Sequence, residues 1–180
     1  KVGIPESVKI LAEKKSGLII VSGPTGSGKS PTIASIIDVI NQKYNYHIIT
    51  IEDPIEYTFE DKKSIISQIL LGKNITSFAQ GIKTSMRENP NVIMIGELRT
   101  HEDIKVALFA AESGHLVITT LHANNAIEAL DRMINYEEKL NLKNLLANTF
   151  QAIITQKLVT TKEHIVLCLE ILLLNNATVS

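Results

Sequence analysis

The segment GPTGSGKSPT, residues 23–32, has the composition and spacing of a phosphate-binding loop. Glycines let a backbone wrap closely around phosphate groups, a lysine reaches the β- and γ-phosphates, and a serine hydroxyl is a ligand for Mg²⁺. A Gly-rich turn that arose by chance is the alternative, but here an apolar run precedes the loop and a helical pattern follows it. The residues that we expect to contact a nucleotide are Gly23, Pro24, Thr25, Gly26, Ser27, Gly28, Lys29, Ser30 and Pro31, with Ser30 as the metal ligand.

Pro31 is an unexpected residue for such a loop, because proline has no backbone N–H to offer to phosphate. We expect a helix to begin near Lys29, so that Pro31 lies in its first turn, where the fixed φ of proline is tolerated. Because a residue before proline disfavours the helical region, Ser30 is expected to turn away from the position that Mg²⁺ requires. Pro31 therefore predicts a weakened nucleotide site, unless the loop shifts and water replaces the missing donor.

Two acidic segments follow apolar runs, TIEDPIEY at 50–57 and VIMIGELR at 92–99. An acid at the tip of a buried strand beside a phosphate loop can orient and deprotonate a water molecule for attack on the γ-phosphate. Either segment alone is more typical of a solvated loop, but their occurrence together with a phosphate loop favours a catalytic interpretation. The charged side chains concerned are Glu52, Asp53, Glu56, Glu97 and Arg99.

Two histidines, His115 and His122, bracket the apolar run of the segment SGHLVITTLHANNA. On an ideal strand, an odd separation of seven residues places two side chains on opposite faces, so the pair need not act together. A single histidine at a strand end is usually a satisfied polar residue. Metal ligation is not expected, because no cysteine or third histidine clusters with them.

The segments that carry this chemistry alternate with apolar runs and amphipathic stretches, which predicts layers of strands and helices. Strands are predicted at 17–22, 47–52, 64–70, 91–96, 115–121 and 164–174. Helices are predicted after the phosphate loop, where isoleucines recur at i, i+3, i+4 and i+7, over Phe78–Met86, around 104–111 and at about 141–156. Thr100 and Asn125 are predicted helix caps, and Gly114 a helix stop. The pattern indicates an α/β fold with a mainly parallel sheet between helices and ligands at the carboxyl ends of the strands.

The composition fits one domain of 180 residues with an aliphatic core, since hydrophobic residues make up 44% and aromatic residues 4%. A formal net charge of −1 provides no general basic field for nucleic acid or for an anionic membrane surface. The single Cys168 excludes an internal disulfide and is expected in the core. No apolar stretch approaches the roughly 18 residues of a spanning helix, and no signal peptide opens the chain. We therefore expect a cytoplasmic protein without direct membrane insertion.

Taken together, these segments resemble, in order and spacing, the motor domain of the type II/IV secretion ATPase superfamily, and within it the type IV pilus retraction ATPases. The resemblance covers nearly the whole chain. Its segments are PESVKILAEKKSGLIIVSGPTGSGKS, ITIEDPIEY, NVIMIGEL, AAESGHLVITTLHANNAIEALDRMI and QAIITQKLV.

The resemblance implies a P-loop NTPase with a RecA-like fold over residues 1–180, which uses ATP and Mg²⁺ and drives pilus retraction in twitching motility. It implies a hexamer that sits against an inner-membrane pilus platform protein, cytoplasmic and peripheral to the inner membrane through that partner. We expect no N-terminal PAS-like domain of the kind that precedes the motor in this family. No nucleic-acid partner is implied.

The resemblance also implies roles for single residues. Lys29 and Ser30 would bind phosphate and Mg²⁺, and Glu97 would be the catalytic base. His122 would contact the γ-phosphate, and His115 would support the subunit boundary. Glu52, Asp53 and Glu56 would organise Mg²⁺ and water. Arginines of this family reach a neighbour's nucleotide, and the candidates are Arg87, Arg99 and Arg132, each with a surface salt bridge as the alternative.

Several residues depart from the family pattern. Pro31 replaces a hydroxyl residue, Asn89-Pro90-Asn91 replaces Asp-Pro-Asp, and Thr100 replaces an aspartate after Arg99. The stretch at 135–142 lacks a Phe-Pro step, and the chain ends before a C-terminal helix of the family. Three alternatives stay open: a degenerate paralogue that binds nucleotide without productive turnover, a pilus assembly or type II secretion ATPase, and a DNA-translocating ring. One cysteine argues against the four-cysteine zinc module of the second, and the near-neutral charge argues against the third.

Overall fold

The computed structural model describes residues 5–73, 75–135, 140–161 and 164–173. In chain order its elements are α1 (Glu6–Lys9), a 3₁₀ turn η1 (Ile10–Glu13), β1 (Gly17–Ser22), α2 (Lys29–Lys43), β2 (His47–Glu52), β3 (Ile65–Leu70), α3 (Phe78–Met86), β4 (Val92–Ile95), α4 (His101–Glu112), β5 (Leu116–Leu121), α5 (Ala126–Asn135), α6 (Leu140–Thr149), β6 (Phe150–Thr160) and β7 (Ile165–Leu173). The predictions for residues 136–139 and 174–180 lie outside the described residues.

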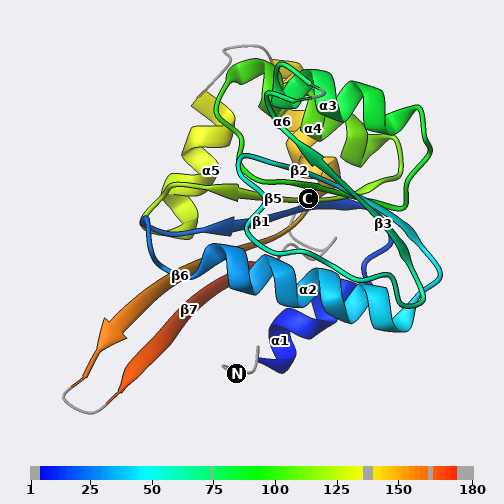
Figure 1. Ribbon diagram of the computed structural model, residues 1–180. Helices are drawn as coiled ribbons and strands as arrows, with labels where there is room; N and C mark the ends of the chain where they lie inside the picture. The colour runs from blue at the N-terminus through cyan, green and yellow to red at the C-terminus, as the bar shows by residue number, and fades with distance from the viewer. Residues whose placement is uncertain (1–4, 74, 136–139, 162–163, 174–180) are drawn as a thin grey trace.

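A single sheet organises the described part of the chain, with seven strands in the order β3-β2-β4-β5-β1-β6-β7 (Figure 1). All neighbouring strands are parallel except β6 and β7, which pair antiparallel. The predicted mainly parallel sheet is therefore confirmed. Parallel strands place their carboxyl ends at one edge, and this edge receives the loops that follow β1, β2, β4 and β5.

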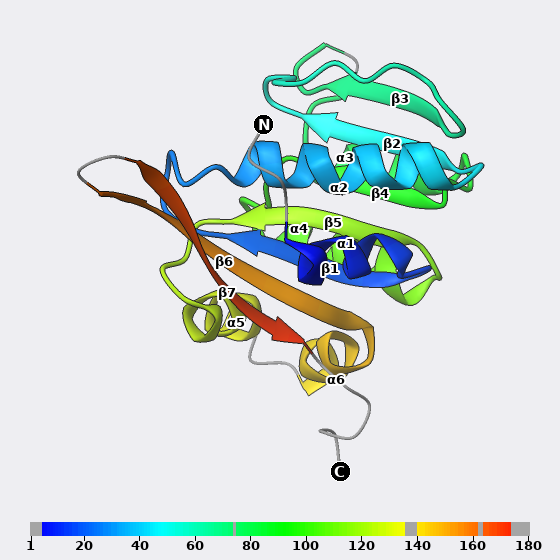
Figure 2. The ribbon, with the colours of Figure 1, turned by 90° about the horizontal axis from the view of Figure 1, so that it is seen from below.

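Helices cover both faces of the sheet, with α3, α4, α5 and α6 on one face and α1 and α2 on the other (Figures 1 and 2). A hydrophobic core lies on each face of the sheet, and strand β1 contributes side chains to both, because successive side chains point to opposite faces. Leu18 and Ile20 belong to the first core, and Ile19 and Val21 to the second. A strand buried on both faces needs a continuous apolar run, which is what GLIIVS provides.

The helix that follows the phosphate loop, α2, packs through the predicted isoleucine face. The isoleucines of this face are all buried, and they belong to the same hydrophobic core as residues of β1 and β2. They are Ile33, Ile36, Ile37 and Ile40. This packing fixes the amino end of α2 at the carboxyl edge of the sheet. The phosphate loop is therefore held between a buried strand and a buried helix.

The predicted caps of α4 and α5 are confirmed. The Thr100 hydroxyl accepts a hydrogen bond from Asp103 N, and the Asp103 carboxylate accepts one from Thr100 N. At α5, Asn125 Oδ1 accepts from Glu128 N at 2.7 Å. Gly114 follows α4 with a φ of 96°, a left-handed conformation that glycine adopts readily at a helix end.

Among the described residues, no helix is long and apolar enough to cross a bilayer.

The end of the chain differs from the prediction. A helix was expected over 141–156, but α6 ends at Thr149 and β6 begins at Phe150. The short apolar run after α6 fits either period, and the β-branched pair Ile153 and Ile154 favours the strand, which pairs with β1.

Strands β6 and β7 form a hairpin that extends away from the layered body (Figures 1 and 2). The prediction that Cys168 lies in the core is wrong, because Cys168 sits in this hairpin opposite Lys157 and is exposed. Half-buried and exposed residues alternate along β7, so that Leu169 and Ile171 pack against the core that α2 covers, whereas Cys168 lies on the exposed face.

Candidate nucleotide site

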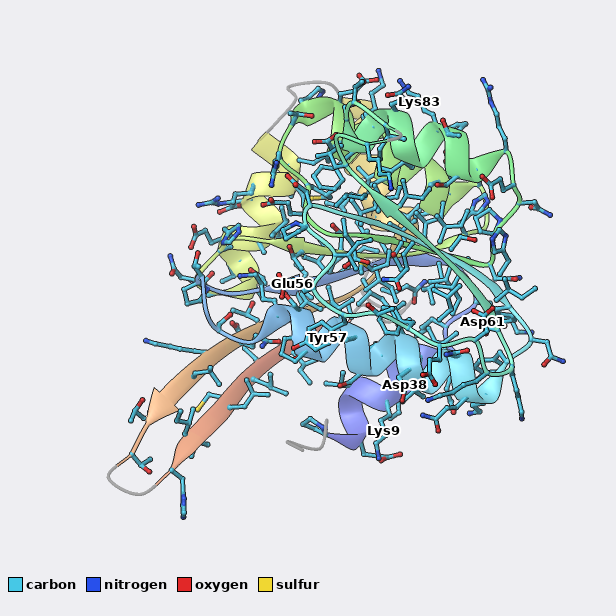
Figure 3. The ribbon with its side chains drawn as sticks, viewed as in Figure 1. Lys9, Asp38, Glu56, Tyr57, Asp61 and Lys83 are labelled. Carbon is cyan, nitrogen blue, oxygen red and sulfur yellow. The ribbon has the colours of Figure 1, made fainter. Side chains whose placement is uncertain are left out.

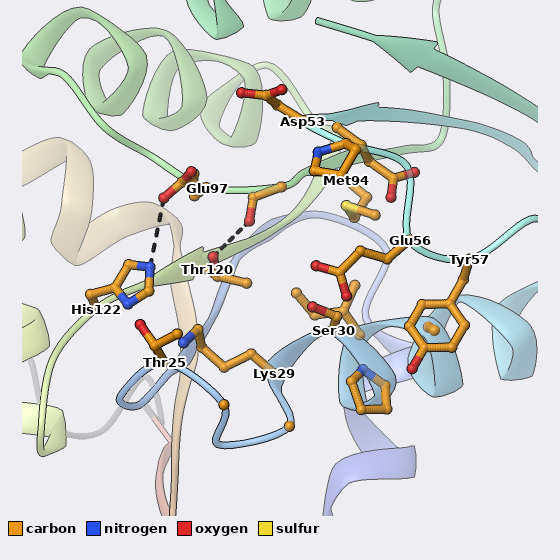
Figure 4. Close-up of a pocket in the computed structure, with 18 of the residues that line it drawn as sticks. Thr25, Lys29, Ser30, Asp53, Glu56, Tyr57, Met94, Glu97, Thr120 and His122 are labelled. Carbon is orange, nitrogen blue, oxygen red and sulfur yellow. Dashed lines mark hydrogen bonds and ion pairs between the residues drawn. The ribbon is translucent and has the colours of Figure 1, made fainter.

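A cleft of about 410 Å³ opens at the carboxyl edge of the sheet (Figure 4). Its walls come from the phosphate loop and the first turns of α2, the segment after β2, the end of β4 with Gly96 and Glu97, and the end of β5 with His122. The loops at this edge therefore bring together the predicted phosphate loop, both acidic segments and one of the two histidines.

The phosphate loop ends in a helix start that lacks a side-chain cap. Gly28 is the N-cap of α2 with a φ of 85°, a left-handed conformation that favours glycine. The first bond of the helix is donated by Thr32 N to Gly28 O at 3.3 Å. The backbone N–H groups of Lys29 and Ser30 thus have no intrahelical acceptor, and such N–H groups at a helix start bind anions.

Lys29 is the buried cation of the site. Its ammonium donates to the carbonyl oxygens of Gly23 at 2.8 Å and Pro24 at 3.0 Å, and in the described part of the chain it forms no ion pair with a carboxylate. Burial lowers the pKa of Lys29, an effect that the charges of Glu97 and Glu56 partly oppose. A desolvated ammonium held only by loop carbonyls is suited to receive phosphate oxygens.

Ser30 and Pro31 lie in the first turn of α2, as predicted for Pro31. The expectation that Pro31 turns Ser30 out of the helical region is wrong, since Ser30 is helical. The preference against helix before proline is a local tendency, and the packing of α2 on the sheet overrides it here. The Ser30 side chain faces that of Glu56 across the cleft (Figure 4).

The acidic segment after β2 places its three carboxylates in different settings. Glu52 is 6% exposed, and its Oε1 accepts from Thr50 Oγ1 at 2.7 Å and Gln68 Nε2 at 3.1 Å. Asp53 is exposed and pairs with Arg99 Nη1 at 3.0 Å. Glu56 is exposed and lies with Tyr57 near the N-terminal half of α2 (Figure 3).

The segment after β4 holds Glu97 beside two basic side chains. Arg99 Nε donates to Glu97 Oε1 at 2.6 Å, Arg99 Nη2 also contacts this oxygen, and His122 Nε2 lies 3.7 Å from Glu97 Oε2 (Figure 4). The hydrogen bond to Glu97, with a smaller effect of Asp53, raises the pKa of Arg99. Arg99 therefore bridges two of the predicted catalytic carboxylates.

Other predicted residues lie away from the cleft. His115, at the opposite end of β5 from His122, is buried, and its Nδ1 lies 3.0 Å from Ala110 O. Arg87 caps the C-terminus of α3, just before β4 begins, and Arg132 pairs with Glu128 on α5 at 3.0 Å. Of the three arginine candidates, only Arg99 contacts residues of the cleft.

Two polar residues that support the site were missed by sequence reasoning. Thr120 Oγ1 donates to Gly96 O at 2.6 Å, which ties the start of the Glu97 segment to β5. Gln156 Nε2 donates to Ser27 O in the phosphate loop at 2.7 Å. Each is a polar side chain in an apolar strand, and this interruption of the apolar run is the signal that could have found them.

The residues present fit a nucleotide with Mg²⁺. The free N–H groups and the Lys29 ammonium suit phosphate oxygens, and the Ser30 hydroxyl and the Glu56 carboxylate are the oxygen ligands that Mg²⁺ prefers. Among the described residues, no group of three or more His, Cys, Asp or Glu side chains could hold a metal. Water molecules and phosphate oxygens would therefore supply the remaining ligands of Mg²⁺.

Comparison with known proteins gives the family of this chain. The sequence profile of the type II/IV secretion system protein family matches residues 5–170. This chain belongs to that family. The type IV pilus retraction ATPase PilT of Pseudomonas aeruginosa is 40% identical over 162 residues, which are 88% of this chain and 47% of PilT. The type II secretion system protein E of Aeromonas hydrophila is 39% identical over 153 residues, which are 84% of this chain and 29% of that protein.

A solved structure shares the fold closely. The crystal structure of the pilus retraction motor PilT with bound ADP superposes with a TM-score of 0.93 at 47% sequence identity, over 97% of this chain and 52% of that chain. The fold of this chain is thus that of the pilus and secretion ATPases. Its length is only about half that of these PilT chains.

Proposed function

We propose that this chain is the ATP-binding and ATP-hydrolysing motor domain of a type IV pilus retraction ATPase, with residues 1–180 as a single RecA-like domain. The observation that carries the proposal is the cleft itself. The Lys29 ammonium, which has no carboxylate partner in the described residues, lines the same cleft as the Glu97 carboxylate. A phosphate binder opposite a general base is what phosphoryl transfer to water requires.

The residues of the cleft would divide the work as follows. Lys29 exchanges the carbonyls of Gly23 and Pro24 for phosphate oxygens, and the N–H groups at the start of α2 bind further phosphate oxygens. The Ser30 hydroxyl, with Glu56, holds Mg²⁺, which supplies charge neutralisation when bound. Asp53 and Glu52 would position the attacking water molecule and hold the acidic segment that follows β2.

Glu97 would take the proton of the attacking water. In the structure its Oε1 accepts from Arg99, so Arg99 must move aside before this oxygen can accept a proton. His122 lies on the other carboxylate oxygen at 3.7 Å, where it can orient Glu97 and reach a γ-phosphate. The Asp53 carboxylate offers Arg99 a second partner, which is already engaged at 3.0 Å.

Retraction is proposed over assembly or secretion on two grounds. In the same sequence comparison, PilT is 40% identical over 88% of this chain, slightly more than the type II secretion protein E at 39% over 84%. The sequence also has one cysteine, where the assembly and secretion ATPases commonly carry a four-cysteine zinc module. The proposal includes a hexamer, an inner-membrane platform protein as partner, and a cytoplasmic place peripheral to the inner membrane.

One observation favours a second candidate function, nucleotide binding without productive turnover. Pro31 removes a backbone donor from the turn of α2 that faces the phosphates. A chain of this kind would bind nucleotide weakly and hydrolyse it too slowly to do mechanical work.

The test measures ATP hydrolysis and ADP affinity on the parent, on Glu97→Gln and on Glu112→Gln. Glu112 is a matched control, since it is an exposed glutamate at the far end of α4. We expect Glu97→Gln to lower turnover by about 10²- to 10⁴-fold with ADP affinity unchanged, and Glu112→Gln to change neither. A parent that binds ADP but does not hydrolyse ATP would support the second candidate. A parent that binds no nucleotide would contradict both.

A further inference from the structure

Gln156 lies directly beneath the phosphate loop. It belongs to β6, is 1% exposed, and donates from Nε2 to the carbonyl oxygen of Ser27 at 2.7 Å. Its neighbour Thr155 pairs with Ser22, the last residue of β1. Gln156 therefore stands level with Gly23, where the chain leaves β1 and enters the loop.

The loop packs closely onto this residue. A Cβ at Gly23 would lie 2.3 Å from the backbone oxygen of Gln156, and a Cβ at Gly28 would lie 3.2 Å from its Nε2. The first distance is shorter than any real contact, so Gly23 must be glycine for the loop to approach β6. Gln156 thus packs directly against the loop at both Gly23 and Gly28.

The hydrogen bond to Ser27 O also constrains the orientation of the peptide between Ser27 and Gly28. A trans peptide is planar, so the Gly28 N–H points away from the Ser27 carbonyl of the same peptide unit. Because Gln156 holds that carbonyl down towards β6, the Gly28 N–H is directed away from the sheet and towards the cleft. Gly28 lines the cleft next to Lys29.

We propose that Gln156 is a positioning residue for phosphate binding, which orients the Ser27–Gly28 peptide so that the Gly28 N–H donates to a nucleotide phosphate. The inference rests on the proposed function, since it assumes that the loop binds a nucleotide. Gln156 itself touches no phosphate and acts through the peptide that it holds.

The experiment compares Gln156→Met with Thr155→Val. Methionine keeps the length of the side chain and loses the donor. Thr155 is the matched control because it is the preceding residue of β6, is buried, and has a hydroxyl without a hydrogen-bond partner among the described residues. Affinities for ADP and for inorganic tripolyphosphate are measured by calorimetry at a temperature where all the proteins are folded.

We expect Gln156→Met to weaken ADP and tripolyphosphate by the same factor, about tenfold for one lost orienting hydrogen bond, and Thr155→Val to leave both unchanged. A purely structural role would lower the melting temperature without changing either affinity, and that result would overturn the proposal. Equal losses in both variants would overturn it as well, because the effect would then belong to β6 in general.

Gln156→Asn covers the case in which Gln156→Met does not fold. It keeps a buried amide but is one methylene too short to reach Ser27 O, so the same tenfold loss is expected, and unchanged affinity would refute the proposal. A parent protein that binds neither ADP nor tripolyphosphate would contradict the proposed function. A parent that binds both, with variants that bind equally well, would contradict only the role of Gln156.

Discussion

Replacing Pro31 by threonine restores a backbone N–H at the third residue of α2. In the structure this residue lies in the first turn and lines the cleft, and the first intrahelical bond is donated one residue later, by Thr32. An N–H at position 31 would thus have no helical acceptor and would be free for a phosphate oxygen. We expect Pro31→Thr to bind nucleotide more tightly than the parent.

The magnitude follows from one added hydrogen bond to a charged acceptor. Such a bond contributes about 1.5–3 kcal/mol, which corresponds to about 10- to 100-fold in affinity. Since Ser30 is already helical, its hydroxyl has no displacement to recover. The gain should therefore be the same for ADP and for Mg-ATP, in contrast to the larger gain for Mg-ATP that a displaced Ser30 would give.

The stability of the nucleotide-free protein should change in the opposite direction. Proline restricts the unfolded chain, so its loss at a compatible position costs about 0.4–1 kcal/mol of unfolding free energy. Pro31 is exposed and its site in the first helical turn is compatible. Higher affinity together with a slightly lower melting temperature is the expected signature.

Calorimetry with ADP and Mg-ATP on the parent, Pro31→Thr and Pro31→Ala tests this reasoning. Both substitutions restore the N–H, so both should tighten binding by a similar factor. Tighter binding by the threonine variant alone would assign the effect to its hydroxyl. Equal affinities in all three proteins would show that position 31 does not face a phosphate, and the reasoning would be refuted.

Three further substitutions test separate parts of the site. Lys29→Ala should weaken ADP binding by at least about 100-fold and leave the circular dichroism spectrum unchanged, because its hydrogen bonds reach only loop carbonyls; tight ADP binding would reject the phosphate role. Arg99→Ala should cost less than about 1 kcal/mol in urea unfolding, since its ion pairs are exposed, and should keep ADP affinity within about twofold; a larger loss of affinity would indicate a direct phosphate contact. Asp103→Ala should cost at least about 2 kcal/mol in urea unfolding, because its buried carboxylate accepts three backbone N–H groups; a loss below about 1 kcal/mol would contradict this.

The sequence predicts those parts of the molecule in which a local pattern is sufficient. Strand β1 is a continuous apolar run, and α2 repeats isoleucine on one face, so their burial follows from period alone. The clustering at one edge was also predictable, because parallel strands bring their carboxyl ends together. Glu97 and His122, which lie 25 residues apart in the chain and 3.7 Å apart in space, are an example.

The parts that sequence reasoning missed depend on partners far along the chain. Residues 150–156 form a strand because they can hydrogen-bond to β1 as its parallel neighbour, and the local sequence does not identify this distant partner. Cys168 is exposed because it lies on the outward face of β7, where exposed and half-buried residues alternate. The role of Gln156 depends on Ser27, 129 residues earlier. Ser30 remains helical because α2 is packed along its length, which outweighs a preference that acts only between neighbours.

The close match to a nucleotide-bound relative and the missing donor at Pro31 are compatible, because a backbone superposition does not register a single N–H group. The TM-score of 0.93 therefore reports the shared backbone fold. The two candidate functions require the same fold and differ in nucleotide affinity and in the rate of hydrolysis. A lost N–H weakens the bound nucleotide, whereas removal of a proton from water depends on Glu97, which is present at the cleft. The lack of an N–H at Pro31 should thus raise KM more than it lowers kcat. Because Lys29 and Glu97 are retained, we favour the proposed motor, with a higher nucleotide requirement, over the second candidate, which binds nucleotide without productive turnover.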